Sequence, residues 1–114
     1  MRLRYSRNET RLSIGVAIVV PINTFAPEPF APTRPILVSV EPFVSEEDGE
    51  LEYIASLTEA NIGASGDTVA EAVKNLKDRL IAKFDMLENM PADRLGKMPR
   101  RQLEILKSLI RRTR

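Results

Sequence analysis

The sequence of 114 residues contains no cysteine, no histidine and no tryptophan. A chain without cysteine forms no disulfide, holds no thiolate zinc site and has no cysteine nucleophile. A chain without histidine has no catalytic triad that depends on an imidazole. Because disulfides are characteristic of oxidising compartments, their absence fits a reducing one, and we expect a cytoplasmic protein.

The sequence also lacks a hydrophobic run long enough to cross a membrane. Its longest apolar stretch covers residues 12–20, far fewer than the roughly 20 residues of a membrane span. Arginines precede this stretch, as in a secretory signal, but Pro21 follows at once and no clear small-residue cleavage site comes after it. We therefore expect neither a membrane segment nor a secretory signal.

The net charge of +1 conceals an uneven distribution. Residues 1–11 and 97–114 are basic, whereas residues 41–52 are acidic. Basic ends of this kind contact phosphates or an acidic protein face, or they are only a solvated helix face and a frayed tail. A chain of this length is one domain with a small core, which favours self-association as a dimer or tetramer.

Residues 1–33 have the composition of an arm appended to a domain. The β-branched apolar run 12–20 predicts a strand that is covered on both faces or pairs with another chain. Five prolines within residues 21–35 predict an extended linker. Phe25 and Phe30 lie in this linker, and we expect them to pack on the domain rather than on a neighbour.

Residues 34–91 predict a β-β-β-α domain. Asp48-Gly49 is a strong turn dipeptide between two strand-like segments. Pro42 lacks an N–H group and predicts an edge strand or a bulge at its position. The expected strands cover residues 36–44, 51–57 and 62–65.

A long amphipathic helix is expected from Thr68 to Met90. Gly66 can adopt a positive φ before the helix, and Asp67 or Thr68 can cap the helix. Thr68 and Glu71 have the spacing of a capping box. Apolar residues recur at steps of three and four, at Val69, Val73, Leu76, Leu80, Phe84 and Leu87.

Residues 92–114 predict a basic C-terminal helix, from Pro99 to Arg112, with an apolar stripe of its own. The expected fold class is therefore α+β: a three-stranded antiparallel sheet, a long helix packed on one face, and a second C-terminal helix.

The segments EYIASLTEANIGASGDT and AEAVKNLKDRLIAKFDML follow an acidic hairpin. Together they resemble the HicB-like antitoxin family over residues 36–90. The aromatic-x-Ala element corresponds to Tyr53-Ile54-Ala55, and the loop glutamate to Glu59. The matching residues at the helix start are Gly66, Asp67, Thr68, Glu71, Ala72 and Asn75.

The chain also departs from this family. The usual proline after the second strand is missing, and the strand that often follows the helix is not evident. Nothing after residue 91 resembles a helix-turn-helix or ribbon-helix-helix module, so the resemblance does not extend to repression of an operon.

The resemblance implies a non-catalytic protein-binding module that neutralises a small, basic, RNA-cleaving toxin. The acidic hairpin and the loop glutamate would then meet the basic face of that toxin. The competing interpretation is that charges at hairpin tips only maintain solubility and protect strand edges. The candidate partner-binding residues are Glu46, Glu47, Asp48, Glu50 and Glu59.

The alternative function is nucleic-acid binding by the basic C-terminal helix, which would give a steep salt dependence. The predicted strands carry few aromatic residues, so they offer no stacking platform for single-stranded bases. The candidate contacts are Arg100, Arg101, Lys107, Arg111 and Arg112.

Catalysis is the third hypothesis, since carboxylates can hold a divalent metal ion. The carboxylates Asp48, Glu50, Glu52 and Glu59 show no informative spacing. We therefore expect no catalytic residue, no metal and no cofactor.

Overall fold

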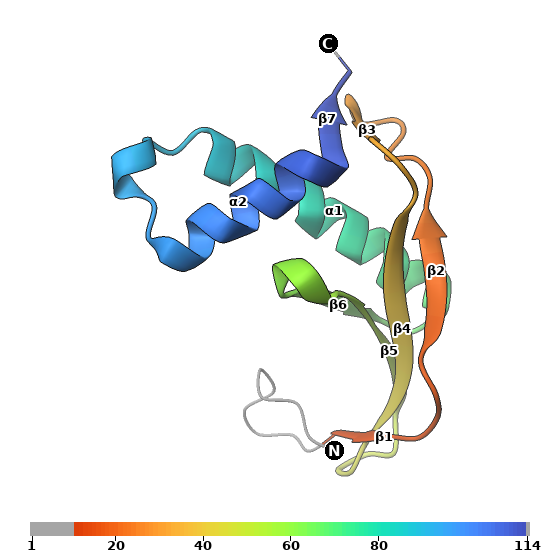
Figure 1. The fold of residues 1–114 in the computed structure, drawn as a ribbon. Coiled ribbons are helices and arrows are strands. Elements are labelled where there is room, and N and C mark those ends of the chain that lie inside the picture. Colours follow the sequence, from red (N-terminus) through yellow and green to blue (C-terminus); the bar gives the residue numbers. More distant parts are fainter. Residues whose placement is uncertain (1–10, 114) are drawn as a thin grey trace.

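The computed structural model describes residues 11–113 and shows an antiparallel sheet with one helix packed against one side and a second helix packed on the first (Figure 1). The α+β class is confirmed. The elements in chain order are β1 (Arg11–Ser13), β2 (Ile18–Ile22), β3 (Phe30–Pro32), β4 (Ile36–Ser45), β5 (Leu51–Leu57), η1 (Thr58–Ala60), β6 (Ile62–Gly66), α1 (Val69–Glu88), η2 (Ala92–Arg94), α2 (Lys97–Leu109) and β7 (Ile110–Arg112).

The main sheet has five strands, in the order β1-β4-β5-β6, with β2 also paired to β4. The expected three strands correspond to β4, β5 and β6, so the prediction of a three-stranded sheet is wrong in the number of strands. β1 and β2 pair with the side of β4 that β5 leaves free. β3 and β7 form a separate two-stranded ribbon.

Pro42 explains why two short strands, rather than one long strand, pair with this side of β4. The carbonyl oxygen of Pro42 accepts a hydrogen bond from the Ile14 amide at 3.2 Å, so the backbone of Pro42 faces the β1–β2 side. On that side proline has no N–H to donate, and the ladder is interrupted between β1 and β2. β4 is therefore a central strand rather than the edge strand that Pro42 suggested.

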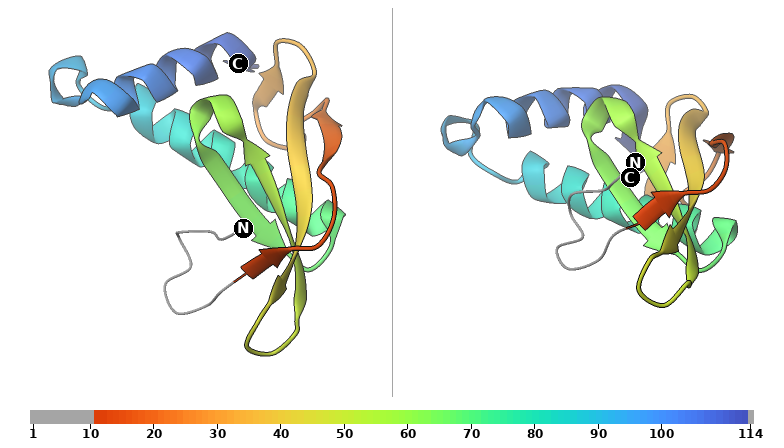
Figure 2. Two further views of the ribbon diagram at one scale, coloured as in Figure 1. Left: turned by 60° about the horizontal axis from the view of Figure 1, so that its bottom comes forward. Right: turned by 90° about the horizontal axis from the view of Figure 1, so that it is seen from below.

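The core lies between the sheet and α1, which crosses one face of it (Figures 1 and 2). Alternate residues of β4 point into this core, because successive side chains of a strand face opposite sides. The stripe of α1 meets them with Ala72, Leu76, Leu80, Phe84 and Leu87, all buried. This is the packing of helix on sheet that the apolar periodicity predicts.

The segment before β4 contributes to the same core. Ile22, Phe25 and Phe30 are buried among the residues of the sheet and α1. The expectation that Phe25 and Phe30 pack on the domain is confirmed. Through β3 and β7, this segment also pairs with the C-terminal end of the chain.

The start of α1 depends on a reciprocal pair of hydrogen bonds. Thr68 is the N-cap, and its hydroxyl oxygen accepts from the Glu71 amide at 3.0 Å. The Glu71 carboxylate accepts from the Asp67 amide at 2.6 Å, so Asp67 supplies a backbone donor rather than the cap. Gly66 does not use the positive φ that is open to glycine, since Gly49 is the only described glycine with a positive φ.

The second helix differs from its expected boundaries. α2 begins two residues earlier than Pro99 and ends at Leu109, because Ile110 turns to extended backbone and starts β7. α2 packs on α1 and η1, and the Gln102 side chain donates to the Ala60 carbonyl at 2.7 Å. Within residues 11–113, neither helix is long and apolar enough to span a membrane.

Candidate protein-binding surfaces

The acidic hairpin between β4 and β5 is the first candidate surface. Its turn is built around Gly49, whose φ is 71° and whose amide donates to the Ser45 carbonyl at 2.9 Å. The carboxylate of Asp48 accepts from the Glu50 amide at 2.9 Å and so braces the loop. Glu46, Glu47 and Glu50 are exposed around this turn, and we call residues 46–50 the acidic tip.

Glu59 lies far from the acidic tip. It belongs to η1, which follows β5, whereas the tip precedes β5. β5 spans seven residues and is therefore about 20 Å long. The structure thus brings together Glu46, Glu47, Asp48 and Glu50 but not Glu59, so a partner bound at the tip would not contact all five carboxylates through one small surface.

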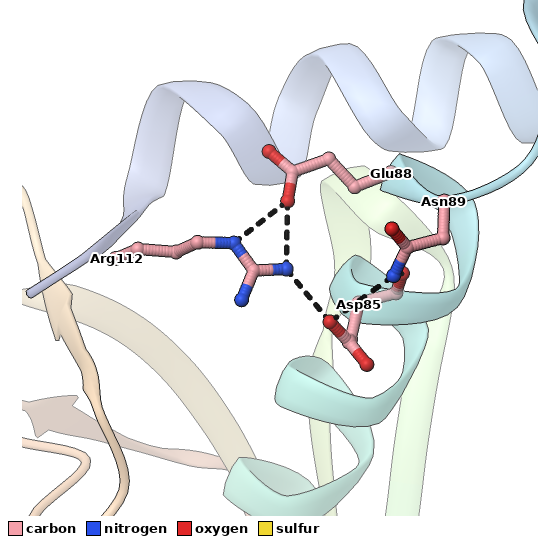
Figure 3. A network of polar contacts seen from close by, with 4 residues as sticks. All are labelled: Asp85, Glu88, Asn89 and Arg112. Atoms are coloured by element: carbon pink, nitrogen blue, oxygen red, sulfur yellow. Dashed lines mark hydrogen bonds and ion pairs between the residues drawn. The ribbon is translucent and has the colours of Figure 1, made fainter. Parts of the chain in front are cut away.

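Arg112 lies in β7 and forms the best-defined polar network of the C-terminal region (Figure 3). Its guanidinium Nη2 lies 2.7 Å from Asp85 Oδ1 and 2.8 Å from Glu88 Oε1. Its carbon Cζ lies 5.0 Å from the centre of the Phe30 ring and 5.8 Å from that of Phe84. The hydrogen bonds that Arg112 donates to Asp85 and, to a smaller extent, to Glu88 raise the pKa of Arg112 above its usual value. Arg112 therefore fastens β7 to α1.

Arg100 also has a structural role. Its guanidinium donates to the backbone carbonyls of Ala92 at 3.0 Å and Leu95 at 3.2 Å, which ties α2 to the loop before it. All five candidate nucleic-acid contacts are exposed, but the guanidinium groups of Arg100 and Arg112 are engaged within the chain. This leaves Arg101, Lys107 and Arg111. Arg101 and Lys107 are six residues apart on α2 and so lie about 120° apart around its axis. These side chains do not form a continuous basic stripe.

Several exposed apolar residues lie along β2, the chain that leads into it and the adjacent end of β4. β2 is an edge strand of the main sheet, because its only strand partner among the described residues is β4. Val16 is 85% exposed and Val19 is 66% exposed. We call the exposed residues Ile14, Val16, Ile18, Val19 and Leu37 the apolar edge. Val19 and Leu37 lie on the face of the sheet opposite to α1. Ile18 instead lies on the same face as Val20 and Ile22.

The apolar edge has little of the usual protection of edge strands. Natural edges are blunted by charges, prolines or covering loops. Between Leu12 and Ile22 there is no charged residue, and Pro21 is the only proline. The sequence indicated this surface through the uniformly apolar run 12–20, but only the fold shows that no other described element covers it.

The carboxylates do not form a metal site in the described part of the chain. No group of three or more His, Cys, Asp or Glu residues there has a geometry that could hold a metal ion. The carboxylates of Asp85 and Glu88 are already engaged by Arg112.

A scan against protein-family models and searches of curated proteins and of solved structures gave no match to this chain. The resemblance of residues 36–90 to HicB-like antitoxins therefore stays a prediction that rests on their sequence. The function proposed below rests on the geometry of the surfaces.

Proposed function

We propose that this chain is a non-catalytic protein-binding module that works as a self-associated assembly, joined through the apolar edge. The observation that carries the proposal is an uncharged, apolar edge strand that leaves its large side chains exposed in the single chain. Exposed apolar surface of this kind marks association sites, because burying it removes the cost of its hydration.

A second copy of the chain fits this edge. Antiparallel pairing of β2 with β2 of a second copy about a two-fold axis places the segment 18–22 opposite itself. Because residues 12–22 carry no charge, no like charges oppose each other across that axis. The two sheets would then continue into one another, although Pro21 of each copy has no N–H group to contribute to the new ladder.

Val19→Lys tests this proposal. Val19 points away from α1 and is 66% exposed, so lysine fits in the single chain but places two ammonium groups near the two-fold axis. We expect the dissociation constant to rise about a hundredfold, since each copy loses about 1.5 kcal/mol of apolar burial. Light scattering coupled to size-exclusion chromatography over a range of protein concentrations measures this change.

The matched control is Met98→Lys. Met98 lies on α2, away from the apolar edge, and is 67% exposed. The control variant should associate like the unmodified protein. A monomeric unmodified protein at micromolar concentration, or a Val19→Lys variant as strongly associated as Met98→Lys, would refute self-association through this edge.

The finer proposal is an antitoxin-like role in which the acidic tip docks on a small basic toxin. The support is the resemblance over residues 36–90 together with the clustering of carboxylates at the tip. The tip projects from the end of the sheet opposite to β3 and β7 (Figure 1). It is distant along β4 from the segment that pairs with β2, so self-association would leave it accessible.

Replacement of Glu46, Glu47 and Asp48 by lysine tests the docking. The triple variant should bind such a toxin at least about tenfold more weakly, because three attractive contacts with a basic face become repulsive. Co-expression with a candidate small basic toxin, read out by pull-down and cell growth, measures the effect. Glu59→Lys is the control, since Glu59 lies at the other end of β5. Equal rescue of growth by both variants would exclude docking through the tip.

A further inference from the structure

β6 is the second edge of the sheet that no other strand of residues 11–113 pairs with, and an open groove of about 930 Å³ runs along it. Figure 2 shows β6 at the outer side of β5, with α1 passing behind it. The groove is lined by serines of the open sheet face, by Gly63 and Ser65 of β6, and by Arg79 and Lys83 of α1. It therefore wraps around the edge of β6, from the open face of the sheet to the helix.

The backbone of β6 turns hydrogen-bonding groups toward this groove. The Ser65 carbonyl accepts from the Asn75 side chain of α1 at 2.8 Å, so the backbone of Ser65 points away from β5. Backbone groups of a strand alternate in direction, so the N–H and C=O groups of Gly63 point outward as well. An extended chain laid along β6 could pair with these groups, as in recognition by strand addition.

The charges of the groove are divided between its two sides. Asn75, Arg79 and Lys83 follow one another at steps of four and so lie along one side of α1. Arg79 and Lys83 have no ion-pair partner among the described residues. On the opposite side, Glu41 lines the groove together with hydroxyl groups, and it accepts a hydrogen bond from Ser13 at 2.6 Å.

We propose that the β6 groove binds an extended, acidic segment of a partner protein, paired with the edge of β6. Alternate side chains of such a segment face opposite sides. Carboxylates at every second position would meet Arg79 and Lys83, and small polar residues between them would face Glu41 and the serines. The five residues of β6 accommodate a segment of about the same length.

Single-stranded nucleic acid is the less suitable occupant of this groove. Its lining contains no aromatic side chain on which bases could stack. Glu41 would also repel phosphates on one side.

The inference rests on the proposed protein-binding role and adds a partner chemistry to it. The two surfaces lie on opposite edges of the sheet, at β2 and at β6. Val19→Lys should therefore leave binding in the groove unchanged, whereas variants of Arg79 and Lys83 should leave the oligomeric state unchanged. Failure of one proposal is thus distinguishable from failure of the other.

The test measures fluorescence anisotropy of a labelled peptide of about seven residues that alternates threonine and glutamate. We expect Arg79→Glu with Lys83→Glu to weaken its binding at least about tenfold. The control pair, Arg101→Glu with Lys107→Glu, makes the same charge change on α2 outside the groove and should retain at least half of the peptide affinity.

A second pair of variants tests the pairing with the backbone. Gly63→Pro removes the N–H group that points outward and should weaken binding of the peptide. Gly63→Ala keeps this N–H group and should leave the peptide affinity unchanged. A peptide with lysine in place of glutamate should not bind. The proposal is overturned if the acidic peptide does not bind, or if its affinity is the same with and without Arg79 and Lys83. It is also overturned if a uridine oligonucleotide binds in the β6 groove instead.

Discussion

Gly66→Ala is expected to destabilise the protein by about 3 kcal/mol, because the junction between β6 and α1 has no room for a side chain. A Cβ atom at Gly66 would lie 2.5 Å from the Ala72 amide nitrogen and 2.8 Å from the Glu71 carbonyl carbon. Both contacts are with backbone of the first turn of α1, which cannot rotate away. Relief would require movement of α1 relative to the sheet. Urea denaturation followed by circular dichroism at a fixed protein concentration measures the change.

Gly63→Ala is the control for this prediction. Gly63 belongs to the same strand, but a Cβ atom there would make ordinary contacts, at 3.4 Å from the Ala55 carbonyl oxygen and 3.6 Å from Ser56 Oγ. We expect a change within about 1 kcal/mol for this variant. Equal denaturation midpoints for the two variants would show that α1 does not approach Gly66 as closely as the structure indicates.

Phe30→Ala is expected to lower the free energy of unfolding by about 3 kcal/mol, although Phe30 lies in a proline-rich segment. Its side chain is 7% exposed and packs edge-on against Phe84, with ring centres 6.0 Å apart. The Arg112 guanidinium lies over the Phe30 ring, and its position depends on Asp85 and Glu88. Alanine would leave a cavity and remove one of the two rings beneath Arg112.

The control for Phe30→Ala is Met98→Ala. Met98 is 67% exposed and contributes nothing to the core, so its truncation should change stability by less than about 0.5 kcal/mol. The comparison also tests whether residues 18–33 are an integral part of the domain. If Phe30→Ala were as stable as Met98→Ala, this segment would be an appendage that the folded domain does not need.

Local chemistry explains why the sequence predicted β4, β5, β6 and α1 well. The predicted bounds of β5 match those of the structure, because Asp48-Gly49 fixes the turn before it and alternation marks its faces. Thr68 and Glu71 mark the start of α1 through hydrogen bonds that span only a few residues. Such signals depend on neighbours in the chain and need no knowledge of the fold.

The candidate sites were less predictable, because they depend on contacts between distant residues. Arg112 was an expected nucleic-acid contact, yet pairing of β7 with β3 brings it to Asp85 and Glu88. The sequence did not distinguish Arg79 and Lys83 from other surface residues, since a cation on a helix is usually only solvated. Their four-residue spacing was the available indication, but the free edge of β6 beside them appears only in the folded chain.

The amino-acid sequence by itself determined the α+β class, the capped amphipathic helix and the acidic turn, because each depends on periodicity or on residues close together in the chain. The tertiary structure alone decided that residues 11–22 extend the sheet on one side of β4, that β3 and β7 pair, and that β2 and β6 are its free edges. Pairing between strands joins residues far apart in sequence, and its outcome depends on which edges remain after all segments compete for them.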